Sequence, residues 1–166
     1  MTFEECFEIV LDIEGRGVVT NDPDDNGGLT KWGISLRAHP ELSEDGIRSL
    51  SKAQAKEIYK ADYWGSIKAT SFPLKTRLAI FDMAVNHGVS RASKLVQKAA
   101  NADGAKLMLD GEIGPITLAA VKAIAPVEFL VLLSMERLAF YQAADDFEKF
   151  GKGWQRRIFK VALLSN

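Results

Sequence analysis

The sequence predicts a mainly α protein with a small irregular or β-like lobe near its N-terminus. Apolar residues recur at helical spacing through most of the 166 residues, whereas strand-like patterns are confined to the neighbourhood of residues 18–19 and 29–34. Pro73, Pro115 and Pro126 each open a helical pattern, and proline suits a first helical position because its missing N–H needs no partner there. A chain of this length fits one domain or two closely packed subdomains.

The first helix is expected over residues 2–13. Thr2 and Glu5 have the spacing of a capping box, in which each side chain binds the main-chain N–H of the other residue. Gly15 and Gly17 are expected to end the helix, because glycine readily adopts the left-handed backbone of a helix end. The apolar residues of this helix recur at helical spacing and are Phe3, Phe7, Val10 and Leu11.

Helices are also expected through the remaining two thirds of the chain. Ser51 and Gln54 mark the start of one that should continue to about Trp64. Later helices are expected at about 74–86, 91–100, 116–124, 127–146 and 153–164. The helix from Val127 onward is apolar all round, which is typical of the buried centre of a helical domain.

The composition is that of an ordinary globular protein, with 47% hydrophobic residues. The single cysteine, Cys6, has no intramolecular disulfide partner, and His39 and His87 lack the spacing of a metal site, so we expect no metal and no cofactor. The start of the chain lacks the basic and apolar segments of a signal peptide, which predicts synthesis in the cytoplasm. No uncharged apolar run reaches the roughly 20 residues that cross a bilayer, so we expect no membrane insertion.

Charge is distributed unevenly along the chain. Residues 1–50 carry 11 acidic and 4 basic side chains, a net charge of −7, and residues 51–166 carry 11 acidic and 17 basic ones, a net charge of +6. A basic body beside an acidic loop suits a polyanionic partner that is held near carboxylates. Nucleic acid and bacterial cell wall both have this chemistry, and solvated helix faces are the plain alternative.

The segment from Glu14 to Ile34 combines a helix-ending carboxylate with a loop rich in Asp, Asn and Gly. Its residues 22–27 fit the opening DxDxNG of a calcium-binding EF-hand loop, but Gly33 occupies the twelfth position, where a bidentate Glu belongs. A phosphate-binding loop is disfavoured as well, because the GK[ST] ending is missing and the acidic side chains would repel phosphate. Casual cation binding by these carboxylates stays open, but the segment favours another kind of carboxylate chemistry.

Glycoside hydrolysis uses every part of this segment. Glu14 stands at the negative end of a helix dipole, where an ionised carboxylate is disfavoured, and is the candidate general acid that protonates the glycosidic oxygen. Asp22 or Asp25 is expected to face the positive charge that develops on the sugar, and the Thr30 hydroxyl to hold a water or the second carboxylate. Glycines such as Gly28 would let the main chain approach a sugar ring.

Several motifs then follow one another along nearly the whole chain. The first are Glu14-Gly15, Asn21-Asp22-Pro23, Asp25-x-Gly27-Gly28, Thr30, Gly33-Ile34, Tyr59, Tyr63 and Trp64. Farther on stand Phe81-Asp82, Val85-Asn86-His87-Gly88, Gln97, Asp110-Gly111-x-x-Gly114-Pro115-x-Thr117, Gly153-Trp154 and Arg157. Together they resemble the signature of the glycoside hydrolase family 108 muramidases, which occur as phage endolysins and as bacterial secretion-activator-type proteins.

This resemblance implies a lysozyme-like helical fold and cleavage between N-acetylmuramic acid and N-acetylglucosamine in peptidoglycan, with Glu14 as the catalytic acid. It implies a catalytic region over residues 1–70 and a helical peptidoglycan-binding-type region over residues 71–166, packed together as one compact unit. The second carboxylate stays open between Asp22 and Asp25, with a slight preference for Asp25. The residues implied in substrate binding are Asn21, Gly28, Tyr63, Trp64, Asn86 and His87.

Structural roles stay open for several of these residues. Tyr63 and Trp64 suit a core as well as a sugar-stacking surface, and Asn86 and His87 can simply end a helix. The family usually has EGGY where this chain has Glu14-Gly15-Arg16-Gly17, and an inward Arg16 would favour the ionised form of the acid.

We expect a monomer that binds no nucleic acid and needs a separate holin-type membrane lesion to reach the cell wall from the cytoplasm. The alternatives are a non-catalytic peptidoglycan-binding or regulatory module and a lytic transglycosylase, which would leave anhydro ends.

Overall fold

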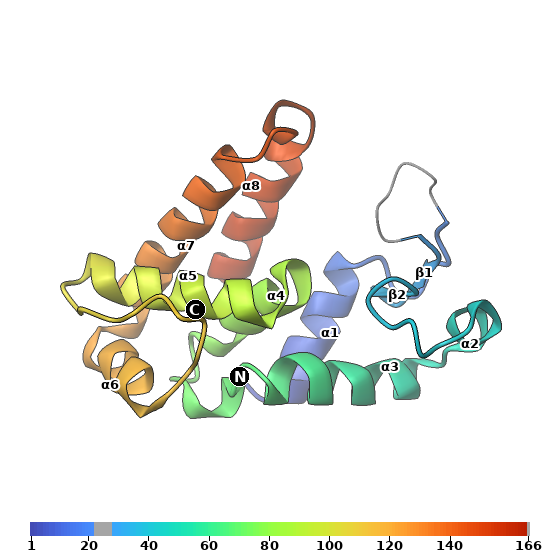
Figure 1. Ribbon diagram of the computed structural model, residues 1–166, viewed down its shortest axis with the longest axis horizontal. Coiled ribbons are helices and arrows are strands. Elements are labelled where there is room, and N and C mark those ends of the chain that lie inside the picture. Colours follow the sequence, from blue (N-terminus) through green and yellow to red (C-terminus); the bar gives the residue numbers. More distant parts are fainter. Residues whose placement is uncertain (22–27, 166) are drawn as a thin grey trace. The chain divides into compact units, whose positions relative to one another are not determined.

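The computed structural model describes residues 1–21 and 28–165 and confirms a mainly α fold with a small β-hairpin (Figure 1). Two compact units are present, which we call the N-terminal unit (Phe3–Ala61) and the C-terminal unit (Met1–Thr2 with Asp62–Asn166). The functional boundary near residue 70 stays a prediction. The elements in chain order are α1 (Phe3–Ile13), β1 (Thr30–Lys31), β2 (Ile34–Ser35), α2 (Glu44–Ser49), α3 (Lys52–Ile58), the π-helix η1 (Tyr59–Gly65), the 3-10 helix η2 (Ala69–Ser71), α4 (Arg77–His87), α5 (Val89–Ala102), α6 (Pro115–Ala123), α7 (Pro126–Gln142) and α8 (Phe147–Leu164).

The N-terminal unit is built around α1, whose apolar face is buried as the sequence predicts. The ring of Phe7 meets that of Tyr59 edge to face, with centroids 5.4 Å apart. The expected capping box opens α3: the Ser51 hydroxyl accepts from the N–H of Gln54, and the Gln54 side chain accepts from the N–H of Ser51 at 2.9 Å. The helical path continues through η1, so the expected extent to about Trp64 is confirmed.

The β-like lobe is a two-stranded hairpin in which Thr30 pairs with Ser35 and Lys31 with Ile34. The turn residues Trp32 and Gly33 have φ angles of 56° and 74°. Positive φ at both central residues is what a two-residue type I′ turn requires, and it matches the twist of the flanking strands. The strand-like pattern expected over residues 29–34 is therefore folded back on itself at Trp32.

In the C-terminal unit, α7 packs against both α5 and α8, and α7 and α8 run side by side as an antiparallel pair (Figure 1). Pro115 and Pro126 occupy the first positions of α6 and α7, as predicted. Pro73 does not open α4. Its carbonyl instead accepts from the N–H and the hydroxyl of Thr76, at 3.0 and 2.9 Å, so a turn precedes the helix and α4 begins at Arg77.

The expectation that the helix from Val127 lies wholly in the core is wrong. Val127, Val131 and Met135 of α7 are 50%, 48% and 62% exposed, whereas Phe129, Leu130 and Leu133 of the same helix are buried. With residues of α8 the three exposed residues line an apolar groove of about 530 Å³. Within the described residues no single helix has the length and apolarity of a membrane span, although α6 and α7 pass that test together across a 113° bend.

Candidate active site

Glu14 lies directly after α1, and its N–H still donates to the Val10 carbonyl at 2.9 Å, as in a last helical turn. Its side chain is half-buried. The next three residues, Gly15, Arg16 and Gly17, have φ angles of 90°, 51° and 80°. This left-handed run ends the helix where the glycines predict, and it turns the chain away from the helix axis immediately beyond the carboxylate.

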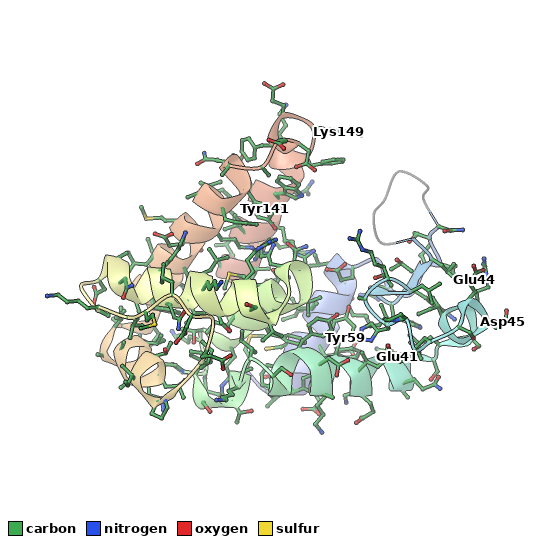
Figure 2. The ribbon with its side chains drawn as sticks, viewed as in Figure 1. Glu41, Glu44, Asp45, Tyr59, Tyr141 and Lys149 are labelled. Carbon is green, nitrogen blue, oxygen red and sulfur yellow. The ribbon has the colours of Figure 1, made fainter. Side chains whose placement is uncertain are left out.

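The turn of the β-hairpin packs against Glu14. A Cβ atom on Gly33 would lie 3.3 Å from both Cβ and Cγ of Glu14 and would overlap the Tyr59 hydroxyl. That hydroxyl donates to the Trp32 carbonyl at 2.9 Å (Tyr59 is labelled in Figure 2). A glycine is thus required at position 33 for two reasons, its positive φ and the close approach of its main chain to the stem of Glu14.

Trp32 supports the same turn from the other side. Its indole N–H donates to the Leu50 carbonyl at 2.9 Å, and its ring lies so close to Gly17 that an added Cβ there would be 2.5 Å from Cε2. The chain leaving Glu14 is therefore packed on the hairpin.

The two ends of the acidic loop are joined through main-chain hydrogen bonds. The N–H of Thr20 donates to the Thr30 carbonyl at 2.9 Å, and the N–H of Thr30 donates back at 2.8 Å. The Thr30 hydroxyl donates to the Gly28 carbonyl at 3.0 Å, and Asn21 is exposed beside the bridge. Asp22 and Asp25, and with them the DxDxNG pattern, lie outside the described residues, so their roles stay predictions.

Arg16, the departure from the family pattern, is engaged away from the catalytic candidate. Its guanidinium pairs with Asp12, one turn back on α1, with Nε 2.7 Å from one oxygen and Nη2 2.8 Å from the other. The hydrogen bond with Asp12, followed by the charge of that carboxylate, raises the pKa of Arg16. The side chains of Arg16 and Asp12 are 73% and 44% exposed.

Tyr63 and Trp64 belong to the C-terminal unit. Trp64 is 7% exposed, its ring meets that of Phe81 edge to face at 5.4 Å, and its N–H donates to the Thr70 hydroxyl at 3.0 Å. These contacts place Trp64 in the core, whereas Tyr63 is half-buried. Trp64 thus has the structural role, and the role of Tyr63 stays a prediction.

Asn86 and His87 stand at the end of α4 and both contact Arg137 of α7. Arg137 Nη2 lies 3.3 Å from Asn86 Oδ1, and Arg137 Nε lies 3.2 Å from His87 Nε2. The Tyr141 hydroxyl, one turn farther along α7, donates to Asn86 Oδ1 at 2.5 Å (Tyr141 is labelled in Figure 2). Burial, and after it the positive charge of Arg137, lowers the pKa of His87 to about 3, so the imidazole is neutral near neutral pH.

A fully buried carboxylate, Asp82, lies beneath these groups. Arg137 donates to its Oδ2 at 2.6 Å and Arg157 of α8 donates to its Oδ1 at 2.8 Å. Burial by itself would raise the pKa of Asp82, but the two guanidiniums lower it below its ordinary value. One carboxylate thereby joins α4, α7 and α8.

The Asp110-Gly111 motif has a structural role in the C-terminal unit. Gln97 of α5, which is buried, donates to Asp110 Oδ1 at 2.6 Å and to the Glu112 carbonyl at 3.1 Å, and it accepts from the N–H of Gly111 at 3.0 Å. These bonds hold the loop before α6 against α5. Among the described residues no group of three His, Cys, Asp or Glu side chains gathers as in a metal site.

Sequence reasoning missed Arg137 and Tyr141. A signal for Arg137 was present, because it is a basic residue in a helix that is mostly apolar, and a buried Arg needs acceptors. Its partners on α4, however, lie 50 and more residues away in the chain, so only the fold identifies them.

A carboxylate at a helix end, a hairpin packed against it and a mainly α body define a protein of the lysozyme-like class. The model of the family glycosyl hydrolase 108 matches residues 7–88. The structure of Brucella abortus SagA is similar to this chain, with 31% sequence identity and a TM-score of 0.88 over 98% of this chain and 92% of that one. A search of curated proteins found no match. The chain belongs to the glycosyl hydrolase 108 family; it is a glycoside hydrolase, and this membership supports action on peptidoglycan.

Proposed function

We propose that this protein is an N-acetylmuramidase that hydrolyses the bond between N-acetylmuramic acid and N-acetylglucosamine in peptidoglycan, with Glu14 as general acid. The observation that supports the proposal is the placement of Glu14 in the last turn of α1, half-buried and with its stem against the Gly33 turn. A carboxyl group held between a helix end and a hairpin stays in one position, as proton transfer to a bound oxygen requires.

In this mechanism Glu14 donates its proton to the glycosidic oxygen, so that the leaving sugar departs as an alcohol. Positive charge develops at the anomeric carbon of the other sugar, and Asp22 or Asp25 stabilises it or orients the attacking water. The water supplies the hydroxyl of the new reducing end and its remaining proton restores the acid. Because the Thr30 hydroxyl uses its proton on the Gly28 carbonyl, its remaining role is to accept a hydrogen bond from that water.

Substrate binding in this proposal involves Asn21 and Gly28 at the ends of the acidic loop, together with Tyr63, Asn86 and His87 of the C-terminal unit. Trp64 is left out, because its ring and its N–H are committed to the core. An enzyme with this substrate acts at the cell wall, and the proposal places the protein there.

The test compares turnover with binding on purified peptidoglycan. The wild type is expected to release soluble fragments, and a Glu14→Gln variant to bind the polymer but release fragments about 100-fold more slowly or less, because glutamine keeps the size and loses the proton. Glu8→Gln is the control. It removes another carboxylate of α1, which pairs with Lys52 on the surface. Equal release by wild type and Glu14→Gln would refute the role of Glu14, and binding without release by the wild type would favour the non-catalytic module.

A further inference from the structure

Each of the three side-chain nitrogens of Arg137 contacts different neighbours. Nη1 donates to Asp82, Nε faces His87 Nε2 at 3.2 Å, and Nη2 faces Asn86 Oδ1 at 3.3 Å and the Tyr141 hydroxyl at 3.4 Å. The residue is 2% exposed. A buried guanidinium with the Asp82 carboxylate behind it is fixed in position, because Asp82 in turn binds Arg157.

The chemistry of arginine determines what the neighbours present to it. A guanidinium has only donors, so the atoms facing it must be acceptors. Asn86 therefore turns its carbonyl oxygen inward, where Tyr141 also donates to it at 2.5 Å, and its NH₂ group points the other way. By the same argument His87 presents an unprotonated Nε2 to Arg137, which leaves the proton of the neutral ring on Nδ1.

The outward-facing nitrogens of both residues are open. Among the residues that the structure describes, neither Asn86 Nδ2 nor His87 Nδ1 has a hydrogen-bond partner, and His87 Nδ1 is not sealed from solvent. Asn86 is exposed. Two neighbouring residues thus offer N–H donors whose orientation is set from behind by one arginine.

The surroundings favour an acceptor ligand. Arg137 and Arg157 outnumber Asp82, and Arg91 lies over the Phe140 ring beside His87, so the local charge is positive. Beside the donors, Trp154 of α8 stacks on Tyr141 with centroids 4.7 Å apart and ring planes at 17°. Positive charge and outward N–H groups suit an oxygen with a full or partial negative charge.

We propose that Arg137 is a positioning residue that presents Asn86 Nδ2–H and His87 Nδ1–H as a two-donor site for amide carbonyl or carboxylate oxygens of peptidoglycan. The proposal rests on the proposed function, and it adds the chemical groups of peptidoglycan that the C-terminal unit binds. Amide carbonyls occur on the acetamido groups of the sugars and in the stem peptide, and carboxylates occur in the stem peptide. The two sources are separated by experiment.

The first experiment changes the donor and keeps the network. In Asn86→Asp the carboxylate still accepts from Arg137 and Tyr141, but its outer atom is an acceptor, so KM for soluble peptidoglycan fragments should rise roughly tenfold with kcat unchanged. Gln142→Glu adds the same charge on the exposed side of α7 and should leave KM unchanged. An unchanged KM for Asn86→Asp in an active enzyme would overturn the inference and leave the muramidase proposal standing.

Binding to two probes identifies the source of the oxygen. In the Glu14→Gln background, chitotetraose offers acetamido carbonyls without a carboxylate, and a muramyl-peptide disaccharide offers both. If the site binds the acetamido carbonyl, adding Asn86→Asp should weaken binding of both probes. If it binds the stem peptide, the substitution should weaken binding of the muramyl-peptide disaccharide alone. Unchanged binding of both would contradict the site.

The last experiment does not depend on activity. Nitrogen-15 NMR of the imidazole is expected to show the neutral Nδ1–H tautomer of His87 in the wild type between pH 5 and 8. In Arg137→Gln the tautomer should shift toward Nε2–H. An Nε2–H tautomer or an imidazolium in the wild type would overturn the positioning role, whatever the enzyme does to peptidoglycan.

Discussion

Gly33 places the turn of the β-hairpin against the side chain of Glu14, and the contact leaves no room for a Cβ atom. We expect Gly33→Ala to lower the free energy of unfolding by roughly 2–4 kcal/mol, because a left-handed backbone and overpacking act together. Gly104→Ala is the matched control: its φ is 99°, nothing lies within 4 Å of the added atom, and it should cost only about 1 kcal/mol. Chemical denaturation measures both, and equal losses would contradict the close packing at Gly33.

His87 makes the free energy of unfolding depend on pH. Burial first, and then Arg137, Arg157 and Arg91, lower its pKa from 6.5 to about 3, against the opposing effect of Asp82. Between these values the unfolded chain binds a proton that the folded chain does not, so the free energy of unfolding falls as the pH falls from about 6.5 toward 3. The slope contributed by one proton is at most about 1.4 kcal/mol per pH unit.

A His87→Gln variant checks this prediction by denaturation at several pH values from 7 to 4.5. Its free energy of unfolding should fall less steeply than that of the wild type over this range. The lowered pKa of Asp82 does not interfere, because the stabilisation from that carboxylate is lost only as the pH falls below its unfolded value near 3.8. Parallel curves for the two proteins would show that His87 is not the group responsible.

At the scale of helices, α7 and α8 combine a buried and an exposed apolar face. Ile158 is 4% exposed between them, whereas its neighbour Phe159 is 59% exposed at the apolar groove. Ile158→Ala should therefore reduce the free energy of unfolding by about 2–5 kcal/mol, and Phe159→Ala by less than about 1 kcal/mol. Thermal and chemical unfolding of the two variants tests this assignment. A larger effect at Phe159 would mean that the groove is covered in the folded protein.

Local signals in the sequence predicted most helices, and the reasons for the misses are physical. The Ser51 capping box and the glycines after Glu14 act within one helical turn, so both could be recognised without the fold. The helix α2 was missed because it has six residues and buries only Ile47. The exposed side of α7 was missed because an apolar sequence pattern does not show whether another element packs against each side of the helix.

Some residues of the candidate site could be predicted from the sequence, and others could not. Glu14 and Thr30 could be identified from the loop that contains them, and the structure adds the hairpin packing that connects Glu14 to Gly33 and Tyr59. The network around Arg137 could not be predicted, because it joins residues of α4 and α7 through tertiary contacts. The residue types of a motif can be identified from the sequence nearby, whereas the orientation of their side chains depends on the fold.

For the molecule as a whole, the comparisons concern the fold of both units, and each unit holds a different part of the proposed function. The family model covers residues 7–88, and the similarity to SagA extends over 98% of the chain, so both units belong to the shared fold. Glu14 and the acidic loop lie in the N-terminal unit, and the two donors positioned by Arg137 lie in the C-terminal unit. The proposed enzyme thus has its acid chemistry in one unit and a substrate contact in the other.

The most direct test of the central claim is mass spectrometry of peptidoglycan digested in water enriched in oxygen-18. Hydrolysis with Glu14 as general acid predicts reducing N-acetylmuramic acid ends that carry one heavy oxygen from the wild type, and nearly none from Glu14→Gln. Anhydro ends would instead identify a lytic transglycosylase. Labelled ends formed equally fast by Glu14→Gln would contradict the assignment of Glu14 as the acid.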